Sequence, residues 1–110
     1  MKPAVLAIAL LSTVAAAASA PPTRVYTGVV TDTMCRLNHA VMKITPDTRC
    51  VLECVRDTKT YKFALAVGTN VYTLSDQETP AQYAGLKVKV TGALYPKTNI
   101  LRVDRMEGTR

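Results

Sequence analysis

Apolar and polar residues alternate over much of the chain beyond residue 24, and a period of two is typical of β-strands. In Tyr61–Val67 every second residue is large and apolar, so these four side chains are expected on one face. Gly68–Asn70 has the composition of a short hairpin turn and precedes a returning strand. The pattern predicts five strands: Val25–Val30, Tyr61–Val67, Val71–Leu74, Lys87–Ala93 and Ile100–Met106.

For the first and the fourth strand the sequence predicts further details. Gly28 lies inside the first strand, where a glycine suggests a bulge or a bend. In the fourth strand, Val88 and Val90 are expected to face the core, with Lys87 and Lys89 in solvent. The last strand places apolar and charged residues on both faces, so its facing stays open.

Two helices are expected between the strands. Thr79–Gln82 looks like a capping box with proline at the first helical position, and Gly85 supplies a stop, which predicts a short helix over Pro80–Ala84. A longer helix is expected over Asp47–Arg56 after the start signal Thr45–Pro46. One face of it would carry Cys50, Val51, Cys54 and Val55.

The order of these elements indicates a fold class. Five strands with a helix between the third and the fourth is the order of a small OB-like Greek-key barrel, and the cysteine-bearing helix would be an insertion between strands 1 and 2. A barrel also removes the exposed edges of so small a sheet. An open five-stranded sheet and an SH3-like barrel remain alternatives, because strand count does not define pairing order.

The amino terminus predicts export. Met1–Lys2 followed by the apolar run Ala4–Ala18 has the form of a secretory signal peptide, and the run is too short for a typical membrane span. Cleavage is expected after Ala18 or Ala20, although Pro21 would hinder the second. We therefore expect a signal peptide over residues 1–20, a single periplasmic or secreted domain over 21–110, and no membrane span after signal removal.

Composition narrows the partners. The net charge of +6 falls to +5 once Lys2 is removed, and the charges are scattered along the chain, as on a solvated surface. Nucleic acid is not expected as a partner outside the cytoplasm; a small ligand or another protein is. A domain of this size often needs a disulfide or a metal to be stable.

Several segments resemble a known group of proteins: GVVTDTMCRLNH, CVLECV, YKFALAVGTNVYTLSDQ and AGLKVKVTGAL. Together they resemble a family of small exported bacterial proteins of unknown function with an OB-like fold. The most specific element is the pattern D-x-x-C-x3-H followed by C-x3-C, formed by Asp32, Cys35, His39, Cys50 and Cys54. The resemblance implies export and the barrel, and it implies no activity.

All three cysteines and the only histidine lie between Cys35 and Cys54. Cys50 and Cys54 are four apart on the expected helix, where Cβ atoms lie ~5–6 Å apart, too far for an unstrained disulfide but suited to a shared metal. If Thr33–Met42 is also helical, Cys35 and His39 share a face in the same way. Cys35, His39, Cys50 and Cys54 would then form a Cys3His site.

A disulfide is the competing interpretation, and cysteine usage in an exported chain favours it. Cys35 paired with Cys50 or Cys54 would close a loop of 15–20 residues and contribute ~3 kcal/mol in the chain-entropy model. The third cysteine would then be a buried apolar residue or would pair with another chain. The leading hypothesis is thus a disulfide-stapled binding or interaction module with an unknown ligand, and the alternative is a metal-binding protein.

If a metal binds, its neighbours indicate which one. Met34 and Met42 flank the segment, and thioether, thiolate and imidazole together suit Zn or Cu. Asp32 could orient His39 or cap the following turn. A thiol-dependent enzyme using Cys35 and His39 is a distant third hypothesis, because the chain shows no Cys-x-x-Cys motif and no phosphate-binding glycine loop. We therefore do not expect an enzyme.

If a disulfide forms in the exported protein, Cys35 should be one of its two partners, because Cys50 and Cys54 are poorly placed for each other on one helix. Peptide mapping under non-reducing conditions identifies the linked peptides. A dominant Cys50–Cys54 link would contradict the expectation and would show that the helix is interrupted there.

Overall fold

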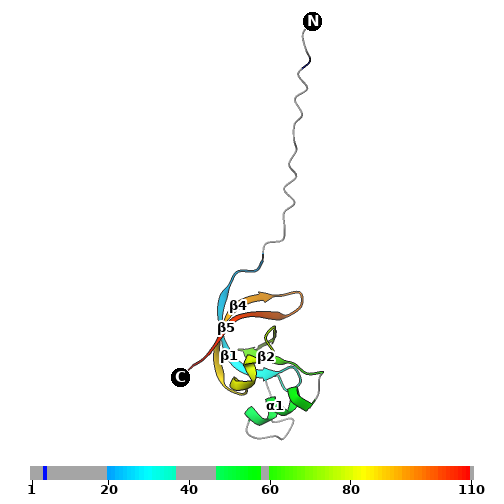
Figure 1. Cartoon of the computed structure of the whole chain (residues 1–110), viewed down its shortest axis with the longest axis vertical. Coiled ribbons are helices and arrows are strands. Elements are labelled where there is room, and N and C mark those ends of the chain that lie inside the picture. Colours follow the sequence, from blue (N-terminus) through cyan, green and yellow to red (C-terminus); the bar gives the residue numbers. More distant parts are fainter. Residues whose placement is uncertain (1–3, 5–19, 37–46, 58–59, 110) are drawn as a thin grey trace.

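The computed structural model describes residues 4, 20–36, 47–57 and 60–109, and within them the chain is mainly β (Figure 1). The described elements all lie close to their predicted positions, with boundaries that differ by no more than two residues. In chain order they are β1 (Arg24–Asp32), α1 (Asp47–Asp57), β2 (Phe63–Val67), β3 (Asn70–Leu74), η2 (Thr79–Tyr83), β4 (Lys87–Tyr95) and β5 (Ile100–Gly108).

The five described strands form one sheet that closes in a ring, in the order β1-β2-β3-β5-β4. β1 belongs to two pairings: Arg24–Val29 runs antiparallel to β4, and Val29–Asp32 runs antiparallel to β2. β4 and β5 form an antiparallel pair, whereas β3 and β5 are parallel. The mainly β fold and the closure of the sheet are thus confirmed, with α1 following β1 and preceding β2. No helix in the described part of the chain has both the length and the apolar composition needed to cross a membrane.

Gly28 lies where β1 passes from one partner strand to the other. The register between β1 and β4 continues through the Gly28–Val88 pair without a shift, so the bulge suggested for this glycine is not found. A Cβ atom at Gly28 would instead collide with the backbone carbonyl oxygen of Ala66 on β2. The glycine is therefore required by the close approach of two strands.

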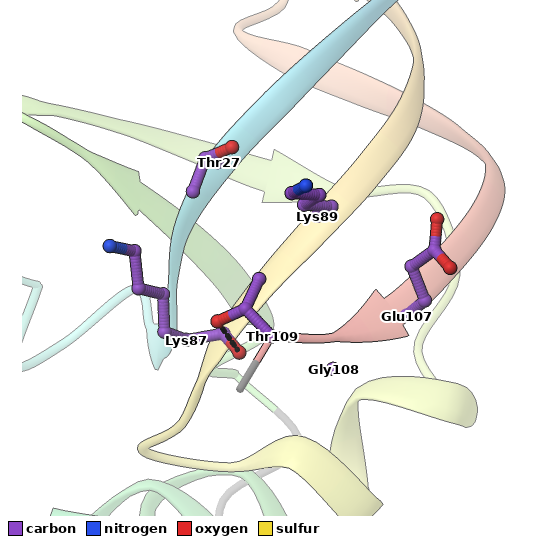
Figure 2. Close-up of a pocket in the computed structure, with 6 residues that line it drawn as sticks. All are labelled: Thr27, Lys87, Lys89, Glu107, Gly108 and Thr109. Atoms are coloured by element: carbon purple, nitrogen blue, oxygen red, sulfur yellow. Dashed lines mark hydrogen bonds between the residues drawn. The ribbon is translucent and has the colours of Figure 1, made fainter.

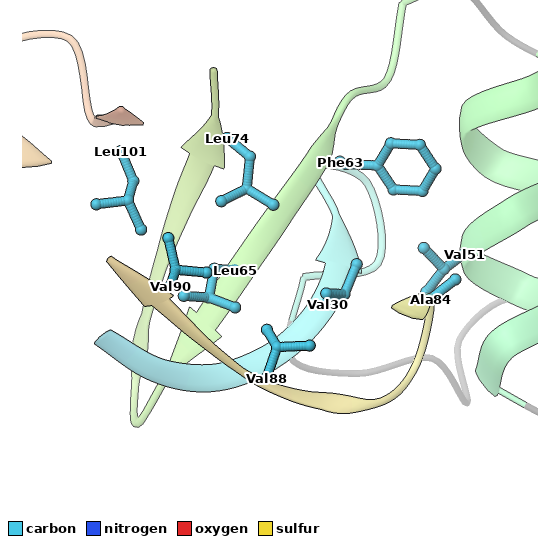
Figure 3. Packing of buried hydrophobic residues seen from close by; sticks show 9 residues of the cluster. All are labelled: Val30, Val51, Phe63, Leu65, Leu74, Ala84, Val88, Val90 and Leu101. Carbon is cyan, nitrogen blue, oxygen red and sulfur yellow. The ribbon is translucent and has the colours of Figure 1, made fainter. Parts of the chain in front are cut away.

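The core fills the inside of the ring (Figure 3). Val88 and Val90 are fully buried, while Lys87 and Lys89 are exposed, as the alternation of β4 predicts. Only one core residue comes from α1, and another follows η2. The cluster consists of Val30, Val51, Phe63, Leu65, Leu74, Ala84, Val88, Val90 and Leu101.

The facing of the last strand is decided by a register shift. Thr91 pairs with Arg105 and Gly92 pairs with Val103, so Asp104 is an extra residue on β5. An extra residue inverts the alternation beyond it. Val103 and Met106 consequently both pack against the core, although they are three residues apart.

The short helix differs from its prediction in two ways. η2 is a 3-10 helix, and its N-cap is Glu78, with no side-chain cap, so the capping box proposed at Thr79 is wrong. The start of the helix is held instead by Asp76, whose Oδ1 accepts hydrogen bonds from the backbone N–H groups of Glu78 at 2.9 Å and Thr79 at 3.0 Å. Gly85 follows the helix with φ +75°, a conformation that favours glycine, as expected of the stop.

Replacing a core leucine should destabilise the protein far more than replacing a surface leucine. Leu101 is 0% exposed, and Leu101→Ala is expected to lower the free energy of unfolding by about 2–5 kcal/mol through lost burial and a residual cavity. Leu86 is 52% exposed, and Leu86→Ala should change the free energy of unfolding by no more than about 0.5 kcal/mol. Urea denaturation of both variants measures the difference, and equal losses would contradict this placement of the core.

Candidate metal centre

The three cysteines converge on one point. The Cys35 Sγ atom lies 3.5 Å from the Cys50 Sγ and 3.7 Å from the Cys54 Sγ, and all three sulfur atoms lie within 4.8 Å of one another. Their exposed fractions are 7%, 0% and 5% for Cys35, Cys50 and Cys54. Two sulfurs bound to one tetrahedral zinc ion at ~2.3 Å are about 3.8 Å apart. The sulfur spacing in this buried cluster is therefore close to that of a thiolate metal site.

α1 supplies two of the three thiols. Cys50 and Cys54 are one helical turn apart and share the buried face with Val51, which enters the ring core. The exposed face carries an ion pair between Arg49 and Glu53, at 2.8 Å. The start of the helix lies against Gly85, where a Cβ atom would come within 2.7 Å of the Thr48 backbone nitrogen.

The third thiol is positioned by a turn that follows β1. Asp32 Oδ1 accepts hydrogen bonds from the backbone N–H groups of Met34 at 2.9 Å and Cys35 at 2.7 Å, so Asp32 caps this turn, as one of its two sequence interpretations proposed. The Arg36 N–H donates to the Asp32 carbonyl oxygen at 3.0 Å, and Arg36 has φ +52°. The described residues 33–36 are thus a turn, and the helix considered for this segment does not begin there.

The surroundings keep two of the thiols protonated. Burial raises the pKa of the Cys35 thiol far above its usual range, and its contacts with the Cys50 and Cys54 thiols and the negative charge of Asp32 raise it further. Burial also raises the pKa of Cys54, with the charge of Asp32 adding to the effect. A reactive cysteine needs the opposite environment, one that stabilises the thiolate. Cys35 and Cys54 therefore lack the electrostatics of a nucleophile, and a bound cation would stabilise their ionised forms.

No disulfide is formed among these three cysteines. A disulfide bond is ~2.05 Å long, and the measured separations of 3.5 and 3.7 Å are well beyond it. The predicted bridge from Cys35 to Cys50 or Cys54 is thus absent from this structure, because neither sulfur lies within bonding distance of the Cys35 sulfur. Cys35 nevertheless lies close to both helical cysteines.

The other residues predicted for the site are distributed as follows. His39 and Met42 lie outside the described residues. Met34 is 42% exposed and so is not part of the buried cluster. Asp32 is fully buried, and its Oδ2 atom has no hydrogen-bond partner among the described residues. The sequence pattern could not reveal this second oxygen, because its burial follows from the pairing of β1 with β2.

A surface hollow of about 420 Å³ is another feature that could hold a ligand. Figure 2 shows its lining, which comes from β1, β4, β5 and the residue after β5, with Lys87, Lys89 and Glu107 as its charged groups. All but one of the lining residues are exposed, and Thr109 is half-buried. Groups that stay hydrated fix a ligand less firmly than buried ones, so the cysteine cluster is the stronger candidate.

Comparison of the chain with protein-family models, with curated proteins and with solved structures finds no match. The resemblance to small exported bacterial proteins stays a prediction that rests on the quoted residues. The candidate site accordingly rests on its own geometry.

The raised thiol pKa values predict how stability depends on pH. A group whose pKa is raised by folding stabilises the protein below its unfolded pKa, and that contribution is lost as the pH rises towards its folded pKa. For the reduced protein with a chelator, the free energy of unfolding should fall once the pH exceeds the ordinary thiol pKa of ~8.5.

Denaturant titrations at several pH values between about 7 and 10 measure this fall. Cys35→Ser is the control, because a serine hydroxyl does not ionise in this range. The free energy of unfolding of this variant should therefore fall less steeply with pH than that of wild type. A slope that is the same in the two proteins would contradict the assignment to the thiols.

Proposed function

We propose that the protein is a small exported metal-binding module that holds one thiophilic ion, Zn²⁺ or Cu⁺. Cys35, Cys50 and Cys54 are the ligands that the described residues supply. The observation that supports this function is the convergence of three buried sulfur atoms within 4.8 Å of one another. Thiolates in such numbers select zinc and copper(I) over calcium or magnesium.

His39 is the proposed fourth ligand. Structural zinc sites are almost always four-coordinate, and Cys3His is a common set. His39 follows Cys35 by four residues, which makes it a natural candidate, although it lies outside the described residues. Copper(I) can be held by three thiolates alone, so the two ions differ in their need for this residue.

The ion would act as a structural link. It would join the turn after β1 to α1, and metal bound only by the folded state adds to folding stability. Because burial raises the pKa values of the Cys35 and Cys54 thiols, we propose a non-enzymatic role.

We also propose that the ring is an OB-type Greek-key barrel spanning residues 21–110. Three features support this: β1 pairs with both β2 and β4, the ring closes in the order β1-β2-β3-β5-β4, and η2 precedes β4. α1 would be an insertion between strands 1 and 2. Export by a signal peptide over residues 1–20 and a periplasmic or secreted location belong to the same proposal.

A second candidate function is an interaction module for a small ligand or a protein, stapled by a disulfide. One observation favours it: the 3.5 Å between the Cys35 and Cys50 sulfurs would need only a modest movement to become a bond. An oxidising compartment would favour that change. Metal and disulfide are mutually exclusive at Cys35, so one experiment can distinguish them.

Metal binding can be tested by thermal unfolding of reduced, chelator-treated protein with and without added zinc or copper(I). Wild type should be stabilised by about 2.7 kcal/mol when the free ion is 100-fold above its dissociation constant. Cys50→Ser should lose this stabilisation, because it removes a ligand, and His39→Ala should lower zinc affinity sharply, because it opens the fourth position.

Arg49→Ala is the matched control, since its side chain lies on the exposed face of α1 and should leave the metal response intact. A melting temperature that is independent of metal would contradict the proposal. Equal stabilisation of Cys50→Ser and wild type would show that the ions bind elsewhere.

A further inference from the structure

Both carboxyl oxygens of Asp32 are buried, although the turn uses only one of them. Its Oδ1 atom accepts the Met34 and Cys35 N–H groups, and its Oδ2 atom has no hydrogen-bond partner among the described residues. The side chain is 0% exposed. A buried carboxylate oxygen without a partner is unfavourable unless a cation or a donor reaches it.

Asp76 shows that the turn itself does not explain this arrangement. Its Oδ1 also accepts the N–H groups of the second and third residues that follow, Glu78 and Thr79, at 2.9 and 3.0 Å. That carboxyl is only partly buried. A neutral asparagine or serine side chain can make the same kind of turn. The burial, the charge and the second oxygen of Asp32 therefore need another reason.

The cysteine cluster supplies that reason. The Cys35 N–H donates directly to Asp32, and the negative charge of Asp32 acts on the thiols of both Cys35 and Cys54. Its oxygen atoms do not belong to the group of ligand atoms that lie within 4.8 Å of one another. Asp32 is therefore a charged neighbour of the sulfurs and not one of the converging ligands.

We propose that Asp32 determines which ion the cluster selects, favouring divalent Zn²⁺ over monovalent Cu⁺. This inference rests on the proposed metal-binding function. With the same thiolates bound, a zinc centre carries one more positive charge than a copper(I) centre. A negative charge held nearby in a buried, weakly screened position stabilises the more positive centre. Asp32 thus affects the choice between zinc and copper(I) through the electrostatic field of its negative charge.

Asp32→Asn tests the role of this charge. Asparagine has nearly the same shape and keeps an oxygen for the two turn hydrogen bonds, but it is neutral. The zinc and copper(I) affinities of reduced protein are measured by competition with chromophoric chelators without oxygen. The ratio of zinc to copper(I) association constants should fall on the order of tenfold in Asp32→Asn. A loosened turn would weaken the binding of both ions alike, so the ratio of the two association constants reports the effect of the charge alone.

Asp76→Asn is the matched control, because it removes the same charge from a turn of the same kind, and its ratio should equal that of wild type. Asp32→Ser, a second neutral variant that can still accept a turn hydrogen bond, should lower the ratio as Asp32→Asn does, and it replaces that variant if Asp32→Asn does not fold.

An unchanged or increased ratio in the neutral Asp32 variants, with wild type binding both ions, would overturn the role of Asp32 and leave the metal-binding function standing. Wild type that binds neither ion would overturn both.

Discussion

The double pairing of β1 is the constraint on which the rest of this structure depends. One strand runs beside β4 over Arg24–Val29 and beside β2 over Val29–Asp32, and this closes the ring. Gly28 permits the close approach of the backbones. Because β1 ends against β2, Asp32 is buried. The turn that Asp32 caps places Cys35 beside Cys50 and Cys54 of α1.

α1 packs on the ring core through the buried Val51 and the partly buried Leu52 and Val55. Among the fully buried core residues of the ring, α1 contributes only Val51, and its first turn contacts Gly85. The rest of its buried face consists of Cys50 and Cys54, which form a separate cluster with Cys35. Contacts between neutral thiols are weak. A bond that involves these sulfurs, to a metal or to each other, would therefore strengthen the attachment.

The geometry of the cluster is compatible with either of the two proposed chemistries, metal binding and disulfide formation. The sulfurs of Cys50 and Cys54, at 3.5 and 3.7 Å from that of Cys35, are close enough to share an ion with it and too far from it for a bond. A reducing environment with available metal leads to the first state, and an oxidising one without metal leads to the second. Under the proposed metal binding, the negative charge of Asp32 would stabilise the metal-bound state and not the disulfide, because a disulfide carries no charge.

Local patterns in the sequence determined the type and approximate bounds of each described element, because alternation and helical spacing act over a few neighbouring residues. They also placed Cys50 and Cys54 on one helix face and Val88 and Val90 inside. They failed at η2, where Asp76 and not Thr79 holds the start, and they left open the facing of β5, where the extra residue Asp104 inverts the alternation. Only the tertiary structure decided that Cys35 meets both helical cysteines and that the second oxygen of Asp32 is buried. These distances depend on how the sheet closes, which couples residues far apart in the chain and leaves no local signal.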